Sequence, residues 1–208
     1  MSVEVAAILD HRLDVSDTRA LPGLLHPQVA PNLATAITAQ FKLLKPSHPL
    51  LSEDEGWQVG WTIADPQWTQ GDVREIIGPA GVSIVVGSRL CEVSFFWRWS
   101  SFLVDAPIRA SVQHVCCELA HLVGANGIVY VPDSAYPVSG VTDLVFNGAS
   151  LTEARVWLRE RCGPPASTPE QIIIEVVDKS YQYEVDPNGY LVDVFPKARH
   201  DETVETVM

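Results

Sequence analysis

Hydrophobic residues along the chain follow two periods, one of two residues and one of about 3.6 residues, which predict strands and helices respectively. Short runs rich in β-branched and aromatic residues, bounded by Pro, Gly or Asp, are typical of strands. Such runs occur at residues 3–9, 57–63, 82–86, 91–103, 128–131 and 172–177. In the longest run, alternation places Val93, Phe95, Trp97 and Trp99 on one face of an extended strand.

Apolar residues at helical spacing predict helices at 33–44 and 107–123, and a shorter helix at 72–77. The helix at 107–123 begins with Pro107, which suits a first helical turn, and ends before Gly124. Ser150 or Thr152 is expected to cap a further helix that runs to residue 161.

The segments between these elements are rich in turn-forming residues. We expect loops at the Pro- and His-rich residues 22–27 and at residues 133–148, with a short strand at 144–146. A β-hairpin is predicted where residues 181–185 and 190–195 flank Asp186-Pro187-Asn188-Gly189. Proline presets φ at the second position of that turn, and glycine accepts a positive φ.

Strand pairs mixed with single helices favour an α+β fold over a doubly wound one. We therefore expect a single domain over residues 1–208, with a mixed, mostly antiparallel sheet that packs against two to three helices. The C-terminal hairpin completes this domain, and residues 197–208 are expected to form a flexible tail.

The chain carries 14 Lys and Arg against 26 Asp and Glu, a formal net charge of −12. Nucleic acids and anionic membranes are bound largely through basic side chains, so this charge argues against both and is compatible with a basic protein partner. No apolar stretch approaches the roughly 18 residues of a membrane helix, and no secretory pattern opens the sequence. Four irregularly spaced cysteines make no disulfide framework, so we expect a cytoplasmic protein with reduced thiols.

Reactive side chains are densest in the helix at 107–123. Its apolar stripe includes Cys116, whereas His114, Cys117, Glu118 and His121 fall on the opposite face. Three of these four could bind a metal ion, or a histidine could activate the Cys117 thiol. The alternative, a helix face that is solvated or packed against a second layer, needs no cofactor and no metal. We expect this structural alternative, because no ligand cluster elsewhere in the sequence completes a zinc site.

Three further positions have both a functional and a structural interpretation. Asp133 and Tyr136 follow a buried strand, where catalytic carboxylates are common, yet Pro-Asp-Ser is also ordinary turn chemistry. Arg98 could grip a carboxylate or phosphate, or pair with an acidic side chain on an open sheet face. We expect the structural role at each position.

Candidate binding residues lie in two places. Trp68 follows an Asp-Pro-Gln turn and breaks the alternating pattern, so it is a candidate anchor for a protein partner. Glu184, Asp186 and Asp193 make the C-terminal hairpin acidic. An acidic surface of this kind suits a basic partner, although a run of charges is also typical of a solvated face.

Parts of the middle third resemble bacterial immunity proteins, the small acidic α+β partners of toxins in polymorphic and contact-dependent systems. The resemblance rests on Trp97-Arg98-Trp99, on the run from His114 to Ala120, and on the strand from Gly127 to Val131. It implies a cytoplasmic, non-enzymatic domain that needs no cofactor and neutralises a cognate toxin, and it assigns no site residues. Two alternatives remain: a small enzyme that uses Cys117 with His114 or His121 or a metal, and a subunit of a larger assembly.

Overall fold

A computed structural model describes residues 3–28, 57–64, 72–78, 82–133, 140–172 and 189–195 of the chain. Within them, seven strands form one antiparallel sheet in the order β2-β3-β4-β5-β1-β6-β7. The strands are β1 (Glu4–Asp10), β2 (Gln58–Ala64), β3 (Asp72–Ile77), β4 (Ser83–Val86), β5 (Leu90–Arg98), β6 (Gly127–Pro132) and β7 (Leu191–Val194). The helices are α1 (Val15–Gln28), α3 (Trp99–Val104), α4 (Ala106–Val123), α5 (Val141–Phe146) and α6 (Leu151–Cys162). The expected α+β fold is confirmed.

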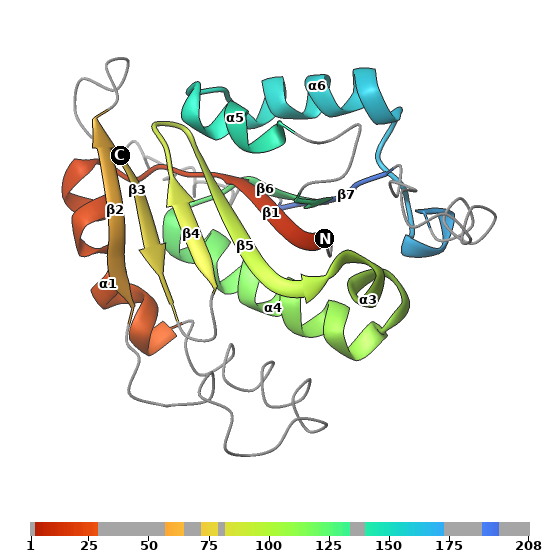
Figure 1. Cartoon of the computed structure of the whole chain (residues 1–208), viewed down its shortest axis with the longest axis horizontal. Helices are drawn as coiled ribbons and strands as arrows, with labels where there is room; N and C mark the ends of the chain where they lie inside the picture. Colours follow the sequence, from red (N-terminus) through yellow and green to blue (C-terminus); the bar gives the residue numbers. More distant parts are fainter. Residues whose placement is uncertain are drawn as a thin grey trace, which may run out of the picture.

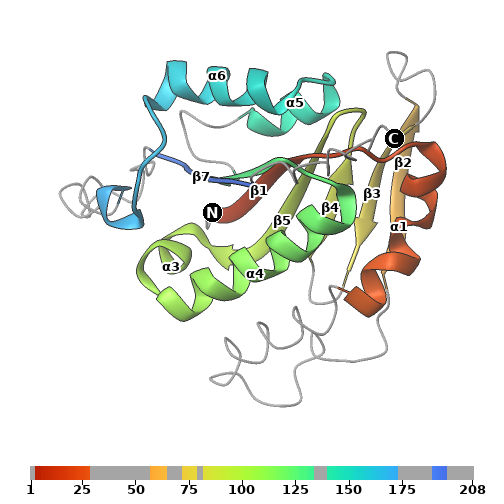
Figure 2. The same cartoon turned by 180° about the vertical axis from the view of Figure 1, so that it is seen from behind.

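Helices cover both faces of the sheet (Figures 1 and 2). Side chains of α1, α3 and α4 form one apolar core against the first face, and those of α5 and α6 form a second core against the other. The central strand β1 contributes to both, because successive side chains point to opposite faces. Val5, Ala7 and Leu9 enter the first core, whereas Ala6 and Ile8 enter the second.

Several predicted elements are confirmed with small shifts of their ends. The opening strand, the strand after Trp57, and the strands now labelled β4 and β6 are present. Helix α4 begins after Asp105, whose side chain accepts from the Ile108 amide at 3.1 Å, and it ends at Gly124 with φ of 69°. Of the two candidate caps of α6, Ser150 is the one used, in a capping box with Glu153.

The prediction of a loop at 22–27 is wrong, because these residues lie in the second half of α1. Asp14 starts this helix, since its carboxylate accepts from the backbone N–H three residues on, at 2.8 Å. Leu21 and Leu25 lie one turn apart and are fully buried. Burying each contributes about 1.5–3 kcal/mol, and an internal proline such as Pro22 costs about 3 kcal/mol. Burial of the two leucines therefore outweighs the cost of the proline.

The prediction of a short helix at 72–77 is also wrong, since this segment is strand β3. Its backbone pairs with β2 on one side and β4 on the other, with Ile76 opposite both Val59 and Ile84. Six residues supply few intrahelical hydrogen bonds, whereas two neighbouring strands can satisfy the backbone groups on both sides of this segment.

The strand expected over 91–103 is too long, because β5 ends at Arg98 and α3 begins with Trp99. Trp99, Phe102 and Leu103 are all buried, at spacings of three and four residues that only a helix aligns. The rings of Trp99 and Phe102 stack at 5.3 Å. Packing of these rings therefore ends the strand.

In the region expected to be a loop at 133–148, residues 141–146 form helix α5 and not a strand. Val141 and Val145 are buried one turn apart in the second core. The residue Ile172, expected to open a strand, lies in a helical turn. The predicted helix at 33–44, the rest of that strand, the first arm of the hairpin and the tail lie outside the described residues.

No helix among the described residues combines the length and the apolar character needed to cross a membrane.

His11, directly after β1, makes both hydrogen bonds that a neutral imidazole can make. Its Nδ1 accepts from the Leu13 amide at 3.2 Å, so its Nε2 carries the proton and donates to the Gly87 carbonyl at 2.8 Å. Burial lowers the pKa of His11, although the Gly87 carbonyl and Asp10 act in the opposite direction. Neutral His11 therefore ties the end of β1 to the turn between β4 and β5.

We expect the fold to lose stability through His11 as the pH falls below the ordinary histidine pKa of 6.5. The unfolded chain then binds a proton that the folded chain accepts only at lower pH, so the contribution is complete above that value and lost below it. Urea unfolding between about pH 7 and pH 5.5 should show a steeper loss for the wild-type protein than for His11→Gln, whose amide does not titrate. Parallel pH profiles would contradict this role.

Candidate functional site

Helix α4 carries a stripe of polar side chains along the flank that lies beside β7. Gln113, Cys117 and His121 form this stripe, because residues four apart lie one above the other on a helix. The Gln113 amide donates to Asp193 Oδ2 at 3.3 Å, and the His121 ring lies 5.8 Å from the Phe195 ring. Alternation along β7 explains the match, since Leu191, Asp193 and Phe195 share the face toward α4.

The structure thus brings together two sets of residues that are far apart in the sequence. Cys117 and His121 belong to the reactive helix face, and Asp193 belongs to the acidic hairpin more than 70 residues later. His114 is exposed and lies further round the helix from β7. Glu118 is half-buried, and its carboxylate is close enough to Cys117 to raise the pKa of that thiol. We call the combined area the α4–β7 surface; it comprises Gln113, Cys117, Glu118, His121, Asp193 and Phe195.

The Cys117 thiol on this surface is not activated. Burial raises its pKa, and the nearby carboxylates of Asp193 and Glu118 raise it further, because each disfavours a second negative charge. Nucleophilic cysteines have lowered pKa values that favour the thiolate. Cys116 faces the core, as expected, where burial raises its pKa well above the usual value. The environment of α4 therefore opposes thiol chemistry.

Among the described residues, no three His, Cys, Asp or Glu side chains come together in a way that would hold a metal ion. The His114, Cys117, Glu118 and His121 face of α4 lies within this part of the chain.

Asp133, a candidate from the sequence, lies at the end of β6. Its Oδ1 accepts from the Glu4 amide at 2.9 Å, and its own amide donates to the Glu4 carbonyl. This is a backbone-capping role that fastens β6 to β1. Arg98 is exposed and precedes α3, with no side-chain hydrogen bond to the helix start. Tyr136, Trp68, Glu184 and Asp186 lie outside the described residues.

Glu92 is a buried carboxyl group that sequence reasoning missed; 4% of the residue is exposed. It pairs across the sheet with Ile8 and Val85, both in the second core. Burial raises its pKa, and hydrogen bonds from Thr142 and Ser94 only partly oppose this effect. Its position in β5 gives a weak signal, because alternation places this acidic residue on the face opposite Val93.

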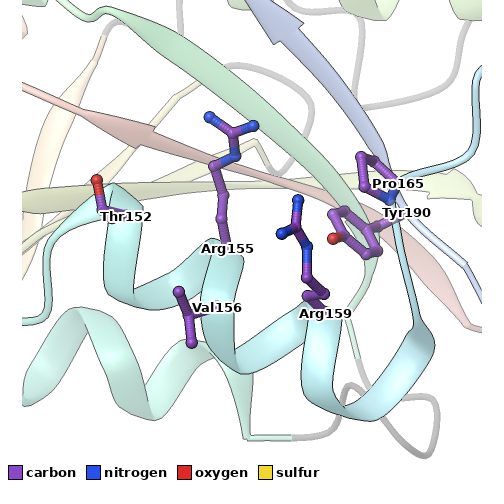
Figure 3. Close-up of a pocket in the computed structure, with 6 residues that line it drawn as sticks. All are labelled: Thr152, Arg155, Val156, Arg159, Pro165 and Tyr190. Atoms are coloured by element: carbon purple, nitrogen blue, oxygen red, sulfur yellow. The ribbon is translucent and has the colours of Figure 1, made fainter.

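A pocket of about 190 Å³ between α6 and the segment that follows it was also missed. It is lined by Thr152, Arg155, Val156, Arg159, Pro165 and Tyr190 (Figure 3). Helix α6 ends at Gly163, where φ is 78°, and the chain then returns toward the sheet. There the Ala166 amide donates to the Tyr190 carbonyl at 2.9 Å. The one sequence signal was the pair of arginines four residues apart.

Comparison of the chain with protein-family models, with curated proteins and with solved structures finds no match. No family therefore supplies a function or a set of site residues. Function has to be inferred from the α4–β7 surface and the α6 pocket themselves.

We expect iodoacetamide to alkylate Cys117 more slowly than free cysteine at neutral pH, because burial and two carboxylates raise its pKa. Asp193→Asn should speed the reaction several-fold, since it removes one negative charge and preserves the contact with Gln113. Mass spectrometry of the alkylated peptides measures both rates in one sample. Cys162, whose pKa is raised chiefly by burial, provides the internal reference. Alkylation of wild-type Cys117 faster than free cysteine would instead support a thiol enzyme.

Replacing Glu92 by Gln should stabilise the protein at about pH 8 and change little at about pH 4, because Gln removes the cost of burying a charge. The raised pKa means that the folded state takes up the proton first. Wild-type stability therefore rises as the pH falls through the folded-state pKa, and this gain is complete below the ordinary value of 4.5. Chemical unfolding of both proteins at the two pH values tests the sign; a difference independent of pH would refute it.

Proposed function

We propose that this chain is a non-enzymatic protein-binding domain and that the α4–β7 surface is its docking surface. One observation carries the proposal: β7 packs Asp193 and Phe195 against Gln113 and His121, which joins a helix flank and an edge segment into one outward surface. Binding hot spots are typically a few well-packed side chains, often aromatic, surrounded by contacts that exclude water.

The charge of this surface indicates the class of partner. Glu118 and Asp193 contribute two carboxylates, and the whole chain carries a formal net charge of −12. Complementary fields speed the encounter of two proteins and disfavour partners of like charge. A basic protein is therefore the partner that fits best.

We further propose that this partner is a basic toxin domain and that the chain acts as its immunity protein. The acidic balance, the α+β fold and the resemblance of the middle third to immunity proteins support this form of the proposal. A cytoplasmic location follows from the same proposal, because such a protein neutralises its toxin inside the cell.

The two alternative functions have less support. A thiol enzyme would need a lowered pKa at Cys117, and burial and the neighbouring carboxylates raise it. A subunit of a larger assembly would expose a contiguous apolar patch. The exposed large hydrophobic residues of the described part come one from each of six elements: Leu24, Val59, Val104, Phe146, Val156 and Val194.

Glu118→Lys should slow association with the partner several-fold at low salt and reduce the salt dependence of the rate, because it reverses a charge on the docking surface. Glu160→Lys, an exposed position on α6 across the sheet, makes the same change in net charge and serves as the matched control. The partner is first captured from a lysate of the native cell at moderate salt, identified by mass spectrometry, purified, and measured by surface plasmon resonance.

Equal effects of the two substitutions, or an association rate indifferent to salt, would contradict the assigned surface. The immunity form is tested separately by expressing the captured protein alone and together with this chain. Growth arrest that is relieved by the wild-type chain and less so by Glu118→Lys is the expected result. A partner without toxicity would overturn the immunity form and leave the protein-binding proposal standing.

A further inference from the structure

The α6 pocket concentrates positive charge on a strongly acidic protein. Arg155 and Arg159 extend from the same side of α6 toward the sheet, and the Arg159 guanidinium lies beside Tyr190 (Figure 3). Like charges four residues apart on a helix repel each other. An anion between the two guanidinium groups would relieve this repulsion.

The described lining of the pocket provides no such anion. Its described residues include neither Asp nor Glu. Glu153, the acidic residue at the start of the helix, is occupied elsewhere, because it caps α6 through Ser150 and lies 3.6 Å from Arg89. In the described part of the chain no carboxylate forms an ion pair with Arg155 or Arg159.

The other lining groups complete a set of donors around an open space. The hydroxyl of Tyr190, a residue that is almost completely buried, lines the pocket beside Arg159 (Figure 3). Thr152 adds a second hydroxyl at the rim, and Val156 and Pro165 provide apolar wall. Two guanidinium groups and two hydroxyls offer more donors than the two oxygens of a carboxylate require, and they match the oxygens of a phosphate better.

We propose that the α6 pocket binds the phosphate group of a phosphate monoester, with Arg155 and Arg159 as the anion clamp. Tyr190 and Thr152 supply neutral donors, and Val156 and Pro165 contact the carbon part of the ligand. The site lies across the sheet from the α4–β7 surface and rests on different residues, so it stands or falls independently of the proposed docking function.

Isothermal titration calorimetry with phenyl phosphate, and with a neutral peptide that carries one phosphoserine, tests the site and separates a small-molecule from a peptide source. Benzoate and the unphosphorylated peptide are the ligand controls. Arg155→Gln combined with Arg159→Gln should weaken phosphate binding about tenfold or more. Arg161→Gln is the matched control, because Arg161 lies on the same helix but packs over Trp157, with its guanidinium carbon 3.9 Å from the ring centroid. Binding should also tighten between about pH 5 and pH 7, as the phosphate takes its second charge.

Arg155→Lys combined with Arg159→Lys keeps the charge and removes the bidentate geometry, so an intermediate loss is expected even if the Gln pair unfolds. The tighter of the two phosphorylated probes identifies the source of the ligand. The proposal is overturned if neither phosphorylated probe binds, if both arginine pairs leave binding unchanged, or if Arg161→Gln weakens it equally. Benzoate that binds as tightly as phenyl phosphate would overturn the assignment to phosphate.

Discussion

The fold depends on the complete burial of β1 between two neighbouring strands and two helical layers. Each residue from Val5 to Leu9 is at most 1% exposed. Backbone groups buried to this degree must be paired, and β5 and β6 pair them on both edges. Polar side chains act only at the two ends of the strand. Asp10 accepts from the Asn126 and Gly127 amides, and Asp133 closes the opposite end against Glu4.

Strand β1 contributes to both cores, and the two faces of the sheet carry different side chains. The α4 side presents carboxylates, a half-buried thiol and two histidines. The α6 side buries the carboxyl group of Glu92 and displays an arginine pair around a pocket. The two faces therefore offer different groups for binding, although both are built on the same strands.

The short strand β7 belongs to both surfaces. Leu191, Asp193 and Phe195 point toward α4, whereas Tyr190 and Val192 pack on the α5 and α6 side. A register slip of one residue would exchange these sets and turn Asp193 toward the α5 and α6 side. Pairing of Leu191 with Tyr130 therefore sets the geometry of the docking surface and of the pocket together.

The sequence by itself determined the elements whose signals are local: the end of α4 at Gly124, the start of α6 at Ser150 or Thr152, and the strands with clear alternation. It also determined which side chains of α4 turn away from the core, because helix geometry alone decides that. Tertiary packing decided α1, β3, α3 and α5, where burial of Leu21 and Leu25, pairing on two edges, and packing of Trp99 and Val141 overrode local preference. It also decided both candidate sites. The approach of Asp193 to Gln113, and of Tyr190 to Arg159, joins residues that are distant in sequence, and no local period encodes which strand will pair beside which helix.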